Sequence, residues 1–213
     1  MAQNWKWGIL FSGDNLTLDE TVHYARQAED AGADSLWTTE LGRDAFVPLA
    51  AMAAECKRVR LGTGVATYAR PPAMTEVSAM SMAELTQGRF ILGLGTAPPM
   101  WNENWHQLTV DKPAKRMREY VEAIRAMWSA SPTNSIDYEG DYIKIRDYRR
   151  IMTPPYPPLP VYLAAVQPAI ALTWIAYQYY IPLLIPCGLA ITSLHKVRDE
   201  NRFMIMAVFA VLG

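Results

Sequence analysis

The chain has 213 residues, 51% of them apolar, with 20 basic and 21 acidic side chains and a formal net charge of −1. This length and composition indicate a globular chain of one domain or at most two, and the near-zero charge argues against DNA or RNA as a partner. Cys56 and Cys187 form no CxxC pair, no metal site is expected, and the amino terminus lacks the apolar stretch of a signal peptide. We therefore expect a cytoplasmic protein with reduced thiols.

The first part of the sequence alternates short apolar runs with amphipathic segments. A strand is predicted over residues 7–11, and Thr17 with Glu20 then forms a capping box for a helix that ends at Gly32. The residues that this helix turns inward are Val22, Ala25 and Ala28. A second strand is predicted over residues 34–38.

Asp44 can cap the next helix, in which Pro48 is tolerated in the first turn. Its apolar stripe is formed by Leu49, Met52, Ala53 and Cys56. Lys57 and Arg58 suit the negative end of this helix.

Two further buried strands are predicted over residues 59–66 and 89–95, with a helix between them that opens at Pro71 and Pro72 and is followed by Gly88. The apolar residues at helical spacing are Met74, Val77, Met80 and Leu85.

Glycines end both of these strands: Gly62 and Gly64 in the first, Gly93 and Gly95 in the second. They can serve tight strand-to-helix turns, or they can let backbone amides approach a cofactor, because ligands of α/β folds bind at the carboxyl ends of the strands. Four glycines at equivalent positions favour the second interpretation.

A longer connection over residues 97–111 precedes the clearest helix of the chain. Its apolar face carries Met117, Tyr120, Val121, Ile124, Met127 and Trp128. Residues 138–148 resemble a small hairpin, and residues 160–166 form a fifth buried strand. Repeating βα units predict a parallel sheet, either closed as a (β/α)8 barrel or open and doubly wound.

Residues 151–194 contain no acidic or basic side chain, and from Ala169 onward the chain is apolar on every side. This segment is therefore not the amphipathic helix that should follow the fifth strand. It is either a buried or aberrant segment or a membrane anchor, since it is long enough to span a bilayer, although Pro182 and Pro186 interrupt it.

Five segments, in this order and spacing, carry a resemblance: LWTTELGRDAFVPLA, RLGTGVATYARPP, GRFILGLGT, RMREYVEAIRAMW and PVYLAAVQP. The chain closely resembles the luciferase-like superfamily of flavin-dependent oxidoreductases, and within it the branch that uses the deazaflavin coenzyme F420. The resemblance covers about residues 5–168. It divides the chain into residues 1–168, the amino-terminal part of a barrel, and residues 169–213, an apolar tail unlike the family.

This family implies a (β/α)8 TIM barrel with the deazaflavin across the carboxyl ends of the strands, and hydride transfer between C5 of the coenzyme and an organic substrate. About five βα units are recognisable, so we expect an incomplete barrel with impaired coenzyme binding. Gene truncation or a shifted reading frame near Gln167 would produce this junction, as would a genuine divergence. The alternative outside enzymes is a catalytically silent fragment or a membrane-associated remnant.

Within the resemblance, Glu40 stands where the family places an acidic residue or histidine near the deazaflavin. It can hydrogen-bond the ring or move a proton, or it can simply cap the following helix. Sugar-phosphate-oxidising relatives carry a catalytic histidine at the next position, where this chain has Leu41. Gly64 and Val65 stand where relatives form a non-proline cis peptide bond. The alternative is an ordinary trans peptide bond at the end of the strand.

Tyr68 and Arg70 can contact the polar side of the coenzyme. The alternative for Arg70 is an ion pair with Glu76 on the next helix and no contact with the coenzyme. Thr96 and Ala97 replace the catalytic glutamate of some relatives. His106 is the histidine placed to donate a proton near neutral pH, or it is a surface residue. It belongs, with Asn102, Glu103 and two tryptophans, Trp101 and Trp105, to a loop that should overhang the same mouth.

The expected cofactor-binding residues are Glu40, Gly62, Gly64, Val65, Tyr68, Gly93, Gly95 and Thr96, and the expected catalytic residues are Glu40 and His106. An FMN-dependent monooxygenase is the alternative within enzymes, because the same barrel mouth accepts either ring. The expected partner is a small-molecule substrate, with a homodimer left open.

Overall fold

The computed structural model describes residues 6–12, 16–40, 42–151, 156, 159–164 and 206–208. The strands of the main sheet are β1 (Gly8–Phe11), β2 (Ser35–Thr38), β3 (Arg60–Thr63), β4 (Ala66–Thr67), β5 (Phe90–Gly95), β8 (Val161–Leu163) and β9 (Met206–Val208). A separate hairpin consists of β6 (Ile136–Glu139) and β7 (Lys144–Tyr148). The helices are α1 (Leu18–Asp30), α2 (Phe46–Glu55), α3 (Pro72–Leu85), α4 (Pro99–His106) and α5 (Pro113–Trp128).

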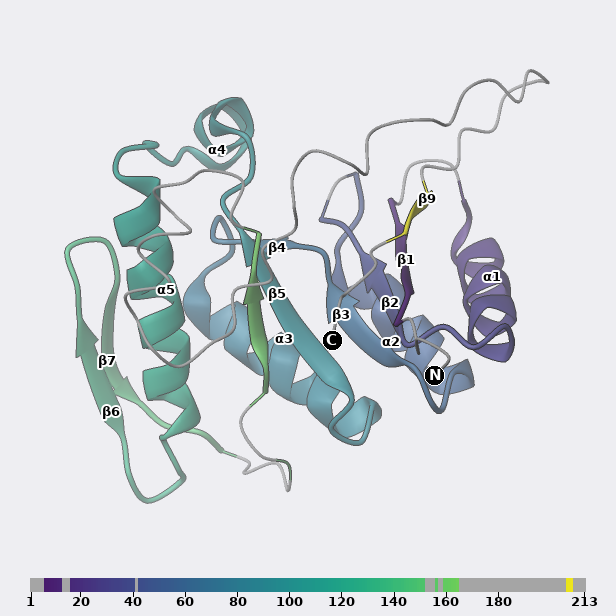
Figure 1. The fold of residues 1–213 in the computed structure, drawn as a ribbon. Helices are drawn as coiled ribbons and strands as arrows, with labels where there is room; N and C mark the ends of the chain where they lie inside the picture. Colours follow the sequence, from purple (N-terminus) through teal and green to yellow (C-terminus); the bar gives the residue numbers. More distant parts are fainter. Residues whose placement is uncertain are drawn as a thin grey trace, which may run out of the picture.

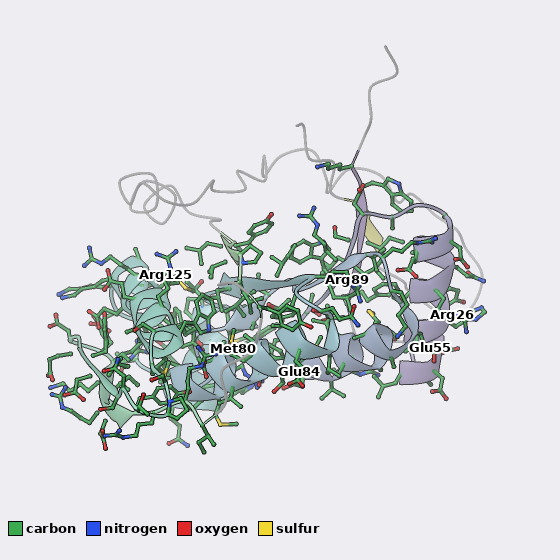
Figure 2. All side chains as sticks on the ribbon, turned by 90° about the horizontal axis from the view of Figure 1, so that it is seen from below. Arg26, Glu55, Met80, Glu84, Arg89 and Arg125 are labelled. Atoms are coloured by element: carbon green, nitrogen blue, oxygen red, sulfur yellow. The ribbon has the colours of Figure 1, made fainter. Side chains whose placement is uncertain are left out.

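The main sheet runs in the order β4-β5-β3-β2-β1-β9, with β8 paired to β5. Every pairing is parallel except that of β9, which lies antiparallel to β1. Helices α1, α2, α3 and α5 pack on one another in chain order along one side of this sheet (Figures 1 and 2). Within the described residues the sheet does not close on itself, which agrees with the predicted α/β fold of an incomplete (β/α)8 barrel.

Local signals in the sequence position the first two helices as predicted. The Thr17 hydroxyl accepts a hydrogen bond from the Glu20 amide at 3.2 Å, and the Glu20 carboxylate accepts one from the Thr17 amide at 2.9 Å. Asp44 Oδ1 accepts the amides of Phe46 at 2.7 Å and Val47 at 3.1 Å. The capping box and the Asp44 cap are therefore confirmed.

The helices differ in how well apolar spacing identifies their buried face. All four residues of the predicted α2 stripe are buried. In α3, by contrast, Met74 is 55% exposed and Leu85 is 53% exposed, and the buried face carries two polar residues, two alanines and one methionine, namely Thr75, Glu76, Ala79, Met82 and Ala83. Thr75 is hydrogen-bonded to Tyr120 of α5, and Glu76 accepts a hydrogen bond from Tyr148 of β7, so the buried polar groups have partners in neighbouring elements.

Three further differences concern the connections. Residues 97–111 are not a plain loop, because α4 lies within them, and the hairpin begins at Ile136 rather than at Tyr138. Strand β9 lies in the segment expected as an apolar tail, most of which, including residues 169–194, is outside the described residues. Among the described helices, none is both long and apolar enough to cross a bilayer.

Candidate functional site

A cluster of charged side chains occupies the carboxyl ends of β2 and β4. Glu40 follows β2, and its carboxylate accepts hydrogen bonds from the Thr67 amide and from Arg70 Nη1, both at 2.7 Å. Arg70 Nη1 also contacts Asp44 Oδ2 at 2.6 Å. The side chains of Glu40 and Arg70 are 17% and 21% exposed, so the ion pair is shielded from solvent but still reachable.

Arg70 is itself held by three other elements. Its guanidinium lies 4.9 Å from the ring centroid of Phe46 in α2. Its carbonyl accepts a hydrogen bond of 2.9 Å from the Tyr120 hydroxyl of α5, which is also hydrogen-bonded to Thr75 of α3 at 2.6 Å. The cluster therefore rests on packed helices rather than on one loop.

These contacts exclude two of the alternatives left open by the sequence. Arg70 pairs with Glu40 and Asp44, whereas Glu76 lies beside Arg150, at 3.6 Å, and accepts a hydrogen bond from Tyr148. The helix after β2 is capped by Asp44 and not by Glu40. Burial raises the pKa of Asp44, but the hydrogen bonds from Arg70 and from two backbone amides outweigh it, so the pKa is lowered overall.

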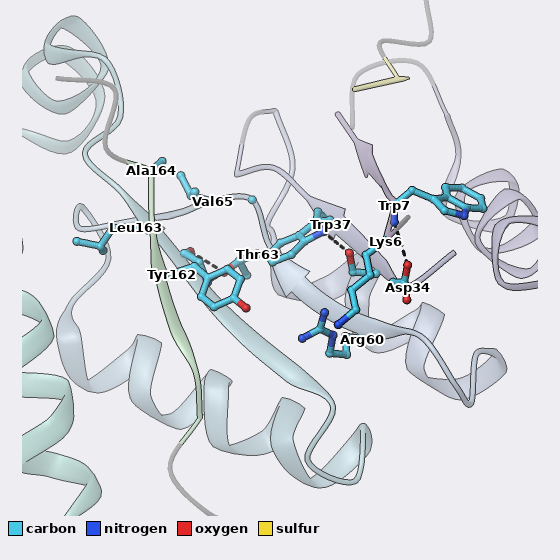
Figure 3. Close-up of a pocket in the computed structure, with 13 residues that line it drawn as sticks. Lys6, Trp7, Asp34, Trp37, Arg60, Thr63, Val65, Tyr162, Leu163 and Ala164 are labelled. Atoms are coloured by element: carbon cyan, nitrogen blue, oxygen red, sulfur yellow. Dashed lines mark hydrogen bonds between the residues drawn. The ribbon is translucent and has the colours of Figure 1, made fainter. Parts of the chain in front are cut away.

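The peptide bond between Gly64 and Val65 is cis, as predicted. Both residues line a cavity of about 300 Å³ on the side of the sheet opposite the helices, together with Gly93 and Ala164 (Figure 3). The backbone amide of Glu40 donates to the Val65 carbonyl at 3.3 Å. The charged cluster and the cavity are therefore joined directly at the carboxyl ends of the strands.

Two aromatic side chains form the wall of this cavity. Trp37 of β2 and Tyr162 of β8 stack with ring centroids 5.9 Å apart, and the indole nitrogen of Trp37 donates to the Ser35 hydroxyl (Figure 3). A Cβ on Gly62 would lie 2.4 Å from the Trp37 ring, and a Cβ on Gly93 would lie 1.9 Å from the Thr63 carbonyl oxygen. These two glycines are thus required by neighbours within the chain, whether or not a cofactor also approaches them.

The opposite end of the cavity carries charge. Lys6 and Arg60 both line it, close to the amino-terminal ends of the strands, and Asp34 lies beside them with one carboxylate oxygen accepting the Trp7 amide (Figure 3). This end is remote along the strands from Gly64 and Val65, so the cavity follows the length of the sheet.

Tyr68 stands between the cluster and β5. Its amide donates to the Gly95 carbonyl at 3.2 Å, and its ring lies 5.7 Å from the Arg116 guanidinium of α5. The side chain is 5% exposed, and its hydroxyl has no hydrogen-bond partner among the described residues. Burial raises the pKa of Tyr68, with Arg116 partly offsetting it, so the phenol is a proton-bearing donor.

Helix α4 extends from the end of β5. The Asn102 side chain is fully buried and donates to the Thr96 carbonyl at 2.6 Å, which fastens the helix to the strand end. Trp101 and Trp105 stack at 4.9 Å, and Trp105 is 61% exposed. His106 is the last residue of this helix, is exposed, and is not among the residues that line the cavity.

The structure therefore brings together most of the residues expected at the site. Glu40, Val65, Tyr68 and Gly95 are connected through backbone hydrogen bonds and the pairing of β4 with β5. His106 stands apart from them. Sequence reasoning missed Trp37 and Tyr162, which could have been found from their register opposite Gly62 and Gly93 on neighbouring strands.

A parallel sheet that carries a polar cluster at its carboxyl ends is the arrangement of TIM-barrel enzymes, whose active sites lie at that end. The family model for luciferase-like monooxygenases matches residues 6–185. The chain belongs to this family.

Among the relatives of this chain are proteins named for coenzyme F420. A Mycobacterium tuberculosis protein, provisionally named a coenzyme F420-dependent oxidoreductase, is 42% identical over 111 residues, which are 51% of this chain and 32% of that protein. The F420-dependent glucose-6-phosphate dehydrogenase of Amycolatopsis mediterranei is 30% identical over 188 residues, which cover 78% of this chain and 53% of the enzyme.

The fold is also shared with a solved structure. The F420-dependent tetrahydromethanopterin reductase of Methanopyrus kandleri superposes with a TM-score of 0.67 at 22% identity, covering 79% of this chain and 52% of that one. The chain thus spans about half, or less, of the length of the relatives that it matches.

Proposed function

We propose that this chain is part of an F420-dependent oxidoreductase that transfers a hydride between the deazaflavin and a small organic substrate. The observation that carries the proposal is the Glu40 carboxylate, fixed by the Thr67 amide, on a residue whose own backbone amide donates to the Val65 carbonyl, in a chain whose similar relatives are named for F420. When bound, the coenzyme supplies a hydride donor or acceptor at C5 of its ring.

The described residues fit the polar edge of such a ring. Glu40 is a hydrogen-bond acceptor with lone pairs left over from Thr67 and Arg70, and Tyr68 offers a buried hydroxyl without a partner in the described part of the chain. Val65 and the cavity beside it supply an apolar wall. Together these groups would hold the ring edge and exclude water on one side.

Glu40 is the residue proposed to act during transfer. Each oxygen of the Glu40 carboxylate accepts one hydrogen bond, which fixes its orientation and leaves a lone pair on each. Glu40 is therefore suited to accept a hydrogen bond from the reacting groups and to stabilise charge that develops there. The exposed His106, at the far end of α4, remains a prediction as a proton donor.

The test compares wild type with Glu40→Gln. F420 affinity is measured by fluorescence, and hydride transfer is followed by absorbance with glucose 6-phosphate, a secondary alcohol and an activated alkene as trial substrates. We expect Glu40→Gln to lower turnover by about 100-fold while changing affinity much less, because a group that acts in the transition state affects turnover first. Glu84→Gln, an exposed carboxylate on α3, is the control. Unchanged turnover in Glu40→Gln would remove Glu40 from the mechanism.

The open sheet has a consequence for the affinity of this chain for the coenzyme. The described residues leave the aromatic cavity wall without a facing strand, and they supply one side of a coenzyme site. We therefore propose that this chain binds the coenzyme more weakly than full-length relatives do. Comparable affinity in a monomeric, cooperatively melting sample would contradict this.

A further inference from the structure

Without its hydrogen bonds, the Glu40 side chain would be flexible. A glutamate side chain has three rotatable bonds, and fixing them costs conformational entropy. In the structure each oxygen has one contact: Oε2 accepts the Thr67 amide, and Oε1 accepts Arg70 Nη1, each at 2.7 Å. One of these two anchors is backbone, so the other, Arg70, is the side chain that determines where the carboxylate points.

Arg70 is oriented independently of Glu40. Its guanidinium lies on the Phe46 ring and contacts Asp44, and its carbonyl is held by Tyr120. A guanidinium that is planar, always charged and stacked on an aromatic ring is a stiff element, whereas a lysine ammonium at the same place would be a single point charge. Arg70 thus transmits the packing of α2 and α5 to the Glu40 side chain.

Removing the guanidinium leaves two carboxylates close together, because Glu40 and Asp44 both contact the same nitrogen, Nη1. Two partly buried carboxylates without a cation repel each other. Asp44 is tied to the amides of Phe46 and Val47, so Glu40, with fewer anchors, is the one that moves. The Thr67 amide then loses its acceptor.

We propose that Arg70 is a positioning residue: it holds the Glu40 carboxylate against the Thr67 amide and thereby keeps the acceptor aimed at the ligand site. The role of that acceptor toward the coenzyme rests on the function proposed above, whereas the control of Glu40 by Arg70 does not.

The experiment uses the full chain, labelled with ¹⁵N, and measures hydrogen exchange of the Thr67 amide. Arg70→Gln should accelerate this exchange at least about tenfold, as expected when a charged hydrogen bond is lost, and Arg70→Lys should restore part of the protection. Adding guanidinium ion at millimolar concentration to Arg70→Gly should restore protection further. Arg89→Gln is the matched control, because Arg89 is a half-buried arginine that donates to the carbonyls of Val59 and Cys56 near the start of β5 (Figure 2).

Exchange of Thr67 that is unchanged in Arg70→Gln overturns the proposal. So does a loss of protection that is equal in Arg89→Gln, since that indicates general destabilisation. F420 affinity and turnover are measured on the same samples. Turnover should fall at least about tenfold in Arg70→Gln while affinity changes much less, and the double variant should lose no more turnover than Glu40→Gln alone, as for residues acting as a unit. If wild type binds no F420, the proposed function fails, while the exchange of Thr67 still decides the role of Arg70.

Discussion

Glu29 provides a sharp test of what joins the first two βα units. It lies near the end of α1, is buried, and accepts three backbone amides from the turn before β3: Lys57 at 3.2 Å, Arg58 at 2.7 Å and Val59 at 2.9 Å. Burial raises its pKa, but the three amide hydrogen bonds outweigh this, so the pKa is lowered overall.

The expected loss follows from counting these donors. In Glu29→Ala the buried Val59 amide is left without an acceptor, at about 1–3 kcal/mol, while the two half-buried amides can partly turn to water, at about 0.5–1 kcal/mol each. We therefore expect unfolding free energy to fall by about 2–5 kcal/mol in Glu29→Ala and by about 1–2 kcal/mol in Glu29→Gln, which keeps one acceptor oxygen.

The lowered pKa of Glu29 determines how its contribution to the free energy of unfolding changes with pH. Because the folded pKa of Glu29 lies below the unfolded one, its stabilisation is complete above the unfolded value, about 4.3, and is lost as pH falls through the folded pKa. Urea denaturation at pH 7 and at stepwise lower pH measures this, with Glu55→Gln as a control, because Glu55 forms an exposed ion pair with Arg26 (Figure 2). The role of the Glu29 carboxylate would be contradicted if Glu29→Gln were as stable as Glu55→Gln at pH 7, or if Glu29→Gln remained less stable than wild type in strong acid.

Two further predictions concern packing and buried charge. Gly93→Ala should destabilise the chain by at least about 2 kcal/mol in urea denaturation, because its Cβ would lie 1.9 Å from the Thr63 carbonyl oxygen. In the comparison variant Gly32→Ala no atom lies within 4 Å of the added Cβ, and the loss is limited to the strain of a positive φ, about 1–2 kcal/mol. A loss in Gly93→Ala that is no larger than in Gly32→Ala would argue against the collision. Burial raises the pKa of Glu76, with Tyr148 and Arg150 offsetting it in part, so its charge makes the fold less stable as pH rises from the unfolded to the folded pKa. Glu76→Gln should remove this slope, and a slope that survives the substitution would contradict it.

The sequence predicted the alternation of strands and helices because that part of the fold depends on local signals. The Thr17–Glu20 capping box, the Asp44 cap and the apolar run of β5 act within a few residues, and each was found where expected. The cis bond after Gly64 was expected from the family resemblance and is present.

Contacts between distant segments were harder to predict. Arg70 has carboxylates within reach both before and after it in the sequence, and only the fold decides that Glu40 and Asp44 are the partners. In the same way, Glu76 faces inward because Tyr148 and Arg150, about seventy residues later, come to lie over it. Helical spacing of apolar residues cannot reveal a buried face whose polar groups are satisfied by tertiary neighbours.

The central claim is that the carboxyl ends of β2, β3 and β4 form one side of a deazaflavin site. The most direct measurement is a parallel titration of the full chain with F420 and with FMN, followed by the fluorescence of each coenzyme. Binding of F420 should be saturable and tighter than binding of FMN, and Glu40→Gln should weaken it far less than it lowers turnover. Equal or tighter binding of FMN, or no saturable binding of F420 by folded protein, would contradict it.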